Sequence, residues 1–416
     1  MTSIGPPRRW HWPTPSVTWD GLAEPWVCQA VRAPGVKWLP ASRRWDGSEA
    51  VAMVSMWTVP VNQTRLLSRS MTSGSSSSAT RERELLEASR GGSEDAYRRL
   101  VELYREELHA HCYRMLGSAH DAEDALQEAL LRAWRGLEGF EGRSSLRSWL
   151  YRIVTNTCLD EMARRPRRVL PADYGPAGDP DERSAAPLVE SVWVEPYPNE
   201  MLEVADAFAS PEARYERREA VELAFITALQ HLPPRQRAVL LLRDVLGFSA
   251  REVADSLETT VGSVSGALHR ARKAIDERLP ERSQQATLRT LGDDRLRELV
   301  EAYVDAWERG DLEAIVAMLV EDGTFAMPPL ALWYRGRDAI AVFLAKWALQ
   351  ERWRLVPTRA NGQLAFGTYS WDAEKRRYVA TGVDVLTLRG AQVEAITAFV
   401  TPEVVRDFGL PAELAA

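Results

Sequence analysis

The side chains best suited to bind a charged polymer lie on one stretch, where small residues are followed by cations. They are Ser263, Ser265, Gly266, His269, Arg270, Arg272 and Lys273. On a helix, Ser263, Gly266, Arg270 and Lys273 share one face, with His269 and Arg272 beside them. Small residues let the start of such a helix approach base edges in a major groove, and the cations then meet phosphates. This pattern makes nucleic acid the first hypothesis for a ligand.

A helix-turn-helix is predicted to position these side chains. Ser249 and Glu252 have the spacing of a capping box, which starts a helix by satisfying its first N–H groups. Apolar residues at helical spacing bury the two helices against each other: Val253, Leu257, Val264 and Leu268. A third helix precedes them, opened by Pro233 and Pro234 and closed by Gly247. Without that upstream helix, an ordinary helical hairpin with a solvated arginine face would be the alternative.

The three helices resemble region 4 of the extracytoplasmic-function (ECF) sigma factors. The matching residues are Leu232-Pro-x-x-x-Arg-x-Val-x-x-Leu242, Val261-Gly-x-Val264 and Leu268-His-Arg-Ala-Arg272. The resemblance implies that the seven residues above read the −35 promoter element. Two features depart from the family: Glu258 stands where a turn glycine is common, and Ser265 and Ala267 stand where cations are common. With Gly266 costing about 1 kcal/mol inside a helix, we expect a weaker grip on DNA than in relatives.

An amphipathic helix is predicted over residues 122–137, begun by a cap pair of Ser118 and Asp121. Its outer face, Asp124, Gln127, Glu128, Leu131 and Arg135, includes a leucine expected to be exposed. Asp121-Ala-Glu-Asp-Ala-Leu-Gln-Glu128 resembles sigma region 2.2, which docks on the β′ clamp of RNA polymerase. The resemblance implies a polymerase-binding surface made of Asp121, Asp124, Gln127, Glu128, Leu131 and Arg135. An apolar anchor ringed by polar groups suits such an interface.

The next helix carries aromatic and cationic residues after a short loop. Ser145-Leu-Arg-Ser-Trp-Leu-Tyr-Arg-Ile-Val-Thr-Asn156 is similar to sigma regions 2.3 and 2.4, which open the −10 element. The implied DNA-binding residues are Arg143, Ser144, Ser145, Trp149, Arg152, Asn156, Arg164 and Arg165. Aromatic platforms and a cationic track can offset the cost of unstacking a base. Trp149 and Tyr151 would alternatively be core aromatics.

Composition limits the remaining possibilities. The 416 residues suffice for about three domains, and a net charge of −7 requires any DNA binding to come from local patches. Cys28, Cys112 and Cys158 are isolated, so we expect no metal site, no disulfide and a reducing cytoplasm. No apolar run reaches the roughly 20 residues of a membrane helix. We expect no cofactor.

Five segments follow from these patterns. Residues 1–93 are predicted to be a disordered or misassigned extension, with translation starting near Met71, because tryptophans lie among prolines without period before residue 70; a Trp-rich binding arm is the alternative. Region 2 spans 94–168, an acidic linker 169–215 and region 4 216–283. The linker contains Trp193-Val-Glu-Pro-Tyr-Pro198, which resembles a motif of sigma factors that carry an added domain, and would otherwise be an inert extended segment.

Residues 288–416 resemble a SnoaL-like domain, an α+β cone, and Asn361-Gly-Gln363 matches a motif of sigma factors bearing it. The expected fold is therefore two all-α sigma modules, a helical bundle and a helix-turn-helix, followed by this cone. Trp333, Tyr334, Trp347 and Tyr369, with Trp371, would line a ligand pocket or fill the cone's core. Asp305, Asp322, Asp384 and Glu394 are the candidate acids, but such carboxylates are usually solvated.

The resemblance, which is close to the actinobacterial sigma factor G group, predicts a non-enzymatic sigma factor for promoter recognition and transcription initiation. Its implied partners are core RNA polymerase, through the β′ clamp and the β flap, and promoter DNA, with an anti-sigma factor left open. We expect the C-terminal domain to regulate in cis by packing on region 2 or the linker, so that the promoter readers are correctly spaced. The rivals are a stand-alone helix-turn-helix activator and a SnoaL-like cyclase or isomerase with accessory helical domains.

Overall fold

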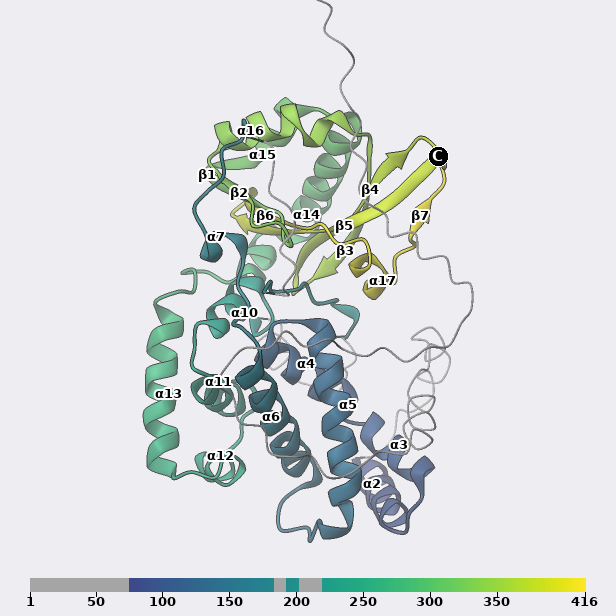
Figure 1. The fold of residues 1–416 in the computed structure, drawn as a ribbon, viewed down its shortest axis with the longest axis vertical. Coiled ribbons are helices and arrows are strands. Elements are labelled where there is room, and N and C mark those ends of the chain that lie inside the picture. The colour runs from purple at the N-terminus through teal and green to yellow at the C-terminus, as the bar shows by residue number, and fades with distance from the viewer. Residues whose placement is uncertain (1–74, 183–191, 202–218) are drawn as a thin grey trace, which may run out of the picture. The chain divides into compact units, whose positions relative to one another are not determined.

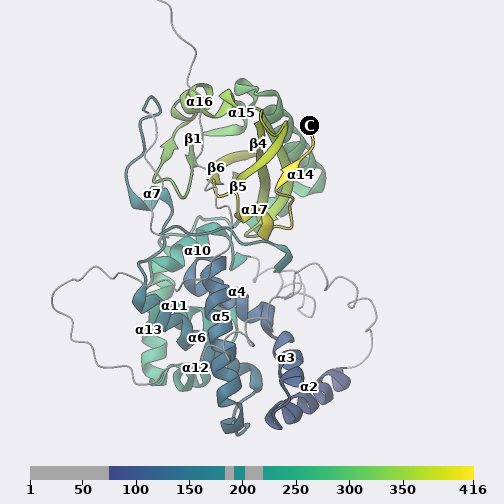
Figure 2. The same ribbon diagram turned by 45° about the vertical axis from the view of Figure 1, so that its right-hand side comes forward.

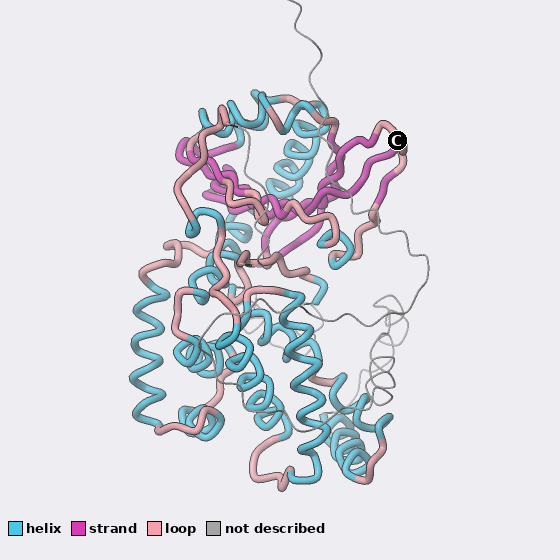
Figure 3. Tube along the Cα trace, viewed as in Figure 1, coloured by secondary structure: helices cyan, strands magenta, loops and turns pink. Residues whose placement is uncertain are grey.

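The computed structural model describes residues 75–182, 192–201 and 219–416 (Figure 1). Helices dominate the described chain up to residue 318, and the named strands lie after it (Figure 3). The Trp-rich segment and the proposed start near Met71 lie outside the described residues, as do linker residues 183–191 and 202–215.

The last part of the expected N-terminal extension is helical and not disordered. Residues Ser75–Arg90 form helix α2, and Leu85 and Ser89 are buried. The physical reason is the sequence Arg81–Ala88, which consists of strong helix formers around two leucines. This helix therefore belongs to the folded part of the chain.

Region 2 is a bundle of four helices, α3 (Glu94–Glu102), α4 (Arg105–Leu116), α5 (Ala119–Gly136) and α6 (Leu146–Arg164). Short turns join them, and Gly117 ends α4 in the left-handed conformation that glycine tolerates. Ser118 caps α5 by accepting from the Asp121 N–H over 3.0 Å, as the sequence predicts. One apolar stripe from each helix fills the core, with Leu100, Leu108, Cys112, Met115, Leu126, Leu130, Leu150, Val154 and Cys158 fully buried.

Region 4 is built from α10 (Leu223–Gln230), α11 (Pro234–Leu240), a π-helical turn η3 (Leu241–Val245), α12 (Ala250–Ser256) and α13 (Val261–Asp276). The predicted capping box is present: the Glu252 N–H donates to Ser249 Oγ over 3.2 Å, and the Ser249 N–H donates to Glu252 Oε2 over 2.8 Å. Both capping bonds come from residues three positions apart, so the start of α12 is encoded locally.

Two described pieces of the linker pair with each other. Val169 forms a parallel bridge with Trp193, in which the Val169 N–H donates to Val192 and the Val194 N–H donates back to Val169. Between them the chain makes the short helix α7 (Pro171–Tyr174). The Trp193–Pro198 motif is buried at Trp193, Val194 and Tyr197, so it is a packed element and not an inert extended segment.

The C-terminal domain combines helices with one mixed sheet (Figures 1 and 2). Helices α14 (Gln284–Arg309), α15 (Leu312–Met318) and α16 (Arg337–Lys346) accompany strands β1 (Leu319–Ala326), β2 (Trp333–Arg335), β3 (Trp353–Ala360), β4 (Gln363–Asp372), β5 (Arg377–Arg389) and β6 (Gln392–Phe399). The strand order is β2-β1-β6-β5-β4-β3, with β7 (Glu413–Leu414) beside β5; only the β1–β6 pair is parallel. Gly390 makes the predicted β5–β6 turn in the left-handed region. The domain is α+β, as expected, and α14, which starts at Gln284, is interrupted by the non-helical Gly292.

The core of this domain lies between the sheet and its helices. Tyr303, Phe325, Leu344, Phe366 and Ile396 are among its buried members, and the Tyr303 and Phe366 rings stack with centroids 4.7 Å apart. Across the described residues, none of the helices is long and apolar enough to cross a membrane.

Candidate nucleic-acid and polymerase interfaces

Helix α13 turns its apolar stripe inward and its polar residues outward. Val264, Leu268, Ala271 and Ile275 are buried, while Ser263, Ser265, His269, Arg270, Arg272 and Lys273 are exposed and Gly266 is half-buried. Thr260 caps the helix by accepting from the Ser263 N–H over 3.1 Å. The predicted reading residues therefore share the solvent side of one well-capped helix.

These residues are not equally available to a ligand. Arg272 makes two hydrogen bonds to Asp244, at 2.8 and 2.7 Å, and this carboxylate raises the pKa of the guanidinium further. The Ser265 hydroxyl donates to the Val261 carbonyl over 3.0 Å. Within the described chain, Arg270 and Lys273 form no ion pair. Arg270 and Lys273 are thus the cations of α13 that can meet phosphates without breaking a contact.

The turn between α12 and α13 carries a residue that sequence analysis noted only as a departure. Glu258 adopts φ 52°, a left-handed conformation that favours glycine. Its carboxylate accepts a hydrogen bond from Arg152 of α6 over 2.9 Å. Nearby, Ser148 donates to Glu252 over 3.3 Å, and the Tyr151 and Phe248 rings meet edge to face at 5.3 Å. Region 4 therefore packs directly on the helix expected to read the −10 element.

The remaining −10 candidates lie in the loop before α6, along the helix and at its end. Arg143 and Ser144 are exposed in the loop, and Ser145 caps the helix by accepting from the Ser148 N–H over 3.0 Å. Trp149 is half-buried against Phe140, with ring centroids 5.1 Å apart, and Asn156 is half-buried. Tyr151 is fully buried, so the core interpretation holds for this aromatic. At the far end Arg164 pairs with Glu161 over 3.2 Å.

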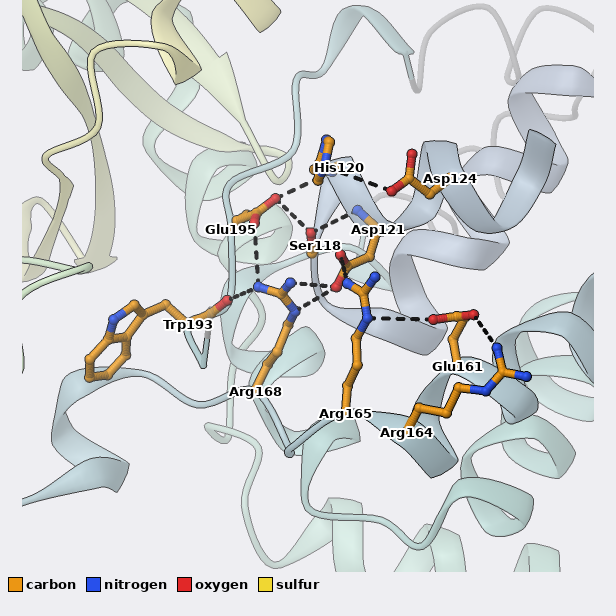
Figure 4. Close-up of polar contacts among 10 residues, drawn as sticks. All are labelled: Ser118, His120, Asp121, Asp124, Glu161, Arg164, Arg165, Arg168, Trp193 and Glu195. Atoms are coloured by element: carbon orange, nitrogen blue, oxygen red, sulfur yellow. Dashed lines mark hydrogen bonds and ion pairs between the residues drawn. The ribbon is translucent and has the colours of Figure 1, made fainter. Parts of the chain in front are cut away.

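A buried ion cluster joins the start of α5, the end of α6 and the linker (Figure 4). Asp121 is 5% exposed and accepts hydrogen bonds from Arg165 and Arg168, the latter equally buried. Arg168 also donates to Trp193 O and, over 3.3 Å, to Glu195. Glu195 completes the cluster by accepting from the Ser118 hydroxyl over 2.8 Å and the His120 N–H over 3.3 Å. Asp121 and Arg165, which were expected to lie on two different surfaces, bind each other here.

The other polymerase-binding candidates remain on the surface of α5. Asp124, Gln127, Glu128 and Arg135 are exposed, and Leu131, expected to be exposed, is half-buried. Arg132, on the same side, donates to Glu128 and to Asp160 of α6, both over 2.9 Å. Four of the six predicted residues thus form a polar surface around a fifth, the partly covered Leu131.

The tip of the β3–β4 hairpin forms a buried junction that sequence analysis found only as a motif. Asn361, fully buried at φ 54°, donates to the Tyr113 hydroxyl of α4 and to the Val221 carbonyl, both over 2.7 Å. Its oxygen accepts from the Tyr197 N–H of the linker over 2.8 Å. One amide thereby contacts region 2, the linker and region 4.

The neighbours of Asn361 extend this junction. The Gly362 N–H donates to Asn199 of the linker over 2.7 Å, and Gln363 accepts from the Leu223 N–H of α10 over 3.0 Å. Glu222, at the start of α10, accepts from the Gln284 and Gln285 N–H groups over 3.0 and 2.8 Å, capping α14. Burial raises the pKa of Glu222 to about 7, and the two N–H groups oppose that rise.

The four pocket candidates contact different parts of the chain. Trp333 donates to the Gly175 carbonyl over 2.9 Å, and Trp347 donates to the Pro180 carbonyl over 3.2 Å, so both bind the linker. Tyr334 is buried against Phe343, with stacked rings 4.7 Å apart. Tyr369 instead donates to Pro411 O over 2.9 Å, near the chain's end.

The candidate acids of this domain differ in environment. Asp322 and Glu394 both bind the exposed Arg389, and Asp305 is exposed. Asp384, expected to be solvated, is 6% exposed, and burial raises its pKa to about 7, partly offset by Tyr303 beside it. Among the described residues, no cluster of His, Cys, Asp and Glu could hold a metal ion.

Three segments of the chain match known families. Residues 100–168 match sigma-70 region 2, residues 222–275 match sigma-70 region 4, and residues 300–396 match the SnoaL-like domain. A sigma-70-type factor with an added C-terminal domain is the class that the fold and these matches define.

Comparison with individual proteins narrows this class. The ECF RNA polymerase sigma factor SigG of Mycobacterium tuberculosis is 41% identical over 329 residues, which cover 76% of this chain and 84% of that protein. The ECF sigma factor SigW of Bacillus subtilis is 29% identical over 45% of this chain and 91% of its own length. The crystal structure of SigJ of M. tuberculosis aligns with 75% of this chain and 98% of its own, at 22% identity and a TM-score of 0.47. The chain belongs to the ECF RNA polymerase sigma factors, which are transcription-initiation factors and not enzymes.

Proposed function

We propose that this ECF sigma factor binds core RNA polymerase through α5 and reads promoter DNA through α6 and α13. The polymerase contact uses Asp124, Gln127, Glu128, Leu131 and Arg135 for the β′ clamp, with Asp121 positioning the start of the helix, and region 4 meets the β flap. The exposure of four of these side chains around Leu131 supports this assignment. The protein would act in the cytoplasm, with an anti-sigma factor as a further partner.

The −10 element would be bound by Arg143, Ser144, Ser145, Trp149, Arg152, Asn156, Arg164 and Arg165. For the −35 element, Arg270 and Lys273 supply phosphate contacts, and Ser263, Ser265, Gly266 and His269 approach base edges. Arg272 supports the helix through Asp244. The observation that carries this proposal is the arrangement of α13. Small side chains occupy its capped first turn, and Arg270 and Lys273, which form no ion pair in the described chain, follow on its solvent side.

The C-terminal domain would control the relative placement of the two promoter readers. Asn361 supports this because one buried side chain bonds region 2, the linker and region 4 together. The Arg152–Glu258 pair also supports this, because it joins α6 to the turn before α13, so the two promoter-reading segments contact each other in this arrangement. We therefore regard it as a resting arrangement from which the readers separate on the promoter.

Reconstitution with core RNA polymerase and genomic DNA fragments tests this function. We expect defined transcription starts that need both this protein and the core enzyme. Tight binding to promoter DNA without polymerase would instead favour a stand-alone activator. No change in transcription starts upon adding the protein would contradict the proposal.

A further inference from the structure

A seven-residue piece of the linker lies against the C-terminal domain. This segment, Gly175-Pro-Ala-Gly-Asp-Pro-Asp181, is here called the strap. The indole of Trp333 in β2 donates to the Gly175 carbonyl over 2.9 Å, and the Gly178 N–H donates to the Trp333 carbonyl over 2.8 Å. Past α16, the Trp347 indole donates to the Pro180 carbonyl over 3.2 Å. Lys346 pairs with Asp181 at the end of the strap.

The surface that holds the strap recognises backbone more than side chains. Both indoles donate to main-chain carbonyls, those of Gly175 and Pro180, so the surface binds the backbone of the strap. At Gly178 the contact is close: an added Cβ would meet Leu332 Cδ1 at 2.7 Å and Tyr334 at 3.5 Å. A segment that binds this surface therefore needs a glycine between prolines, followed by an acidic side chain that can pair with Lys346.

Charge complements this geometry. Asp179 lies near the Tyr334 hydroxyl, whose pKa rises to about 12 through burial and, to a smaller extent, this carboxylate. Asp181 and Lys346 are both exposed, and an exposed pair contributes little to stability. Each of the three hydrogen bonds between the strap and the two tryptophans contributes only modestly to stability, so this contact is reversible.

We propose that the C-terminal domain of this sigma factor is a peptide-binding module. Its surface of Trp333, Tyr334, Lys346 and Trp347 takes a glycine- and proline-rich acidic segment, which in the free protein is its own strap. Core polymerase competes for the same segment when it engages the linker. This second part rests on the proposed function, whereas binding of the strap does not.

Hydrogen exchange of the full-length protein tests strap binding directly. The double variant Trp333→Phe/Trp347→Phe keeps both rings but removes both N–H donors. Exchange of the Gly178 amide, which donates to the Trp333 carbonyl, should then rise about tenfold or more, as expected from losing two hydrogen bonds on one equilibrium. Trp353→Phe is the matched control, because that indole donates over 2.8 Å to Ala348 within its own domain. It should leave the strap's exchange unchanged.

Titration with core polymerase tests the competition. The double variant should bind the core enzyme more tightly than the wild type by a factor that approaches the change in exchange. Addition of core polymerase to the wild type should itself raise exchange in the strap. Unchanged exchange in the double variant, or equal loosening in Trp353→Phe, would overturn the peptide-binding assignment. Faster exchange with no gain in core affinity would overturn the competition, and a wild type that binds no core enzyme would instead refute the proposed function.

Discussion

The side-chain amide of Asn361 donates to the hydroxyl of Tyr113 over 2.7 Å, although 248 positions separate the two residues. Because the same amide also bonds Val221 and Tyr197, replacing it leaves buried polar groups without partners. Asn361→Ala should lower the free energy of unfolding by about 2–4 kcal/mol. Calorimetry should then resolve separate transitions in the variant, whereas a single transition is expected for the wild type.

A matched control for this variant is available in the same domain. Arg376 has nearly the same backbone conformation, φ 52°, but lies exposed in the turn between β4 and β5. Arg376→Ala should therefore report only the cost of alanine at a left-handed position. Equal losses of stability in the two variants would mean that the Asn361 bonds contribute nothing.

The buried ion cluster predicts an unequal response of two arginines. Arg168→Ala should destabilise the protein by about 2–4 kcal/mol, because Asp121 and Glu195 keep their charges and lose their buried partner. Arg132→Ala removes two surface pairs and should cost less than about 1 kcal/mol. Urea denaturation of both variants provides the comparison, and a larger loss in Arg132→Ala would contradict it.

Glu258 separates the cost of its backbone from the effect of its charge. Glu258→Gln keeps the unfavourable φ but weakens the contact with Arg152, whereas Glu258→Gly also relieves the backbone by roughly 1 kcal/mol. If the pair restrains Arg152, both variants should raise promoter opening, by up to about fivefold for an exposed pair. Permanganate footprinting of the open complex measures this. Increased opening in the glycine variant alone would assign the effect to the turn.

The two arginines of α13 should contribute differently to promoter binding. Arg270→Ala should weaken holoenzyme binding to many promoter sequences and reduce the salt dependence of log Kd by about one unit, as expected for one lost phosphate contact. Arg272 is held by Asp244, so Arg272→Ala should change the salt dependence less. Filter binding at several salt concentrations distinguishes the two. A larger change for Arg272 would assign the phosphate contact to that residue.

Asp384 predicts how stability depends on pH. Its pKa is raised by burial from 3.8 to about 7, so between these values the folded state binds more protons than the unfolded state. Stability from this group is therefore fully present below about pH 4, falls as pH rises and levels off above about pH 7. The change amounts to roughly 4 kcal/mol at most. Asp384→Asn should flatten the pH profile of urea denaturation over this window; an unchanged slope would show that the carboxyl ionises without cost.

The features that the sequence predicted correctly depend on neighbouring residues. The Ser118 cap and the Ser249–Glu252 capping box each join positions three apart, and the β5–β6 turn needs only Arg389-Gly390. The family resemblance placed the sigma modules and the cone in order. The local pattern could not show that Arg168 binds Asp121, because Arg164, Arg165 and Arg167 lie close by and carry the same charge.

Burial and contacts between distant segments were beyond sequence reasoning for the same reason. Asp384 alternates with Val383 and Val385 on a strand, and a period of two cannot tell that both faces of the strand are covered. Glu258 was visible as a departure from a common glycine, but its partner Arg152 lies 106 positions away. Trp333 and Trp347 were candidates for a ligand pocket, and the structure shows that both bind the chain's own linker.

The left-handed Asn361 also constrains how this protein can be rebuilt in evolution or in the laboratory. A cone domain taken from another protein would fit these helices only if its corresponding hairpin offered a carboxamide on a backbone turned the same way. Cutting the domain off would uncover the Val221 carbonyl and the Tyr197 N–H that it now shields. The helical part of the chain and the C-terminal domain therefore depend on each other, and their contacting residues are expected to change together.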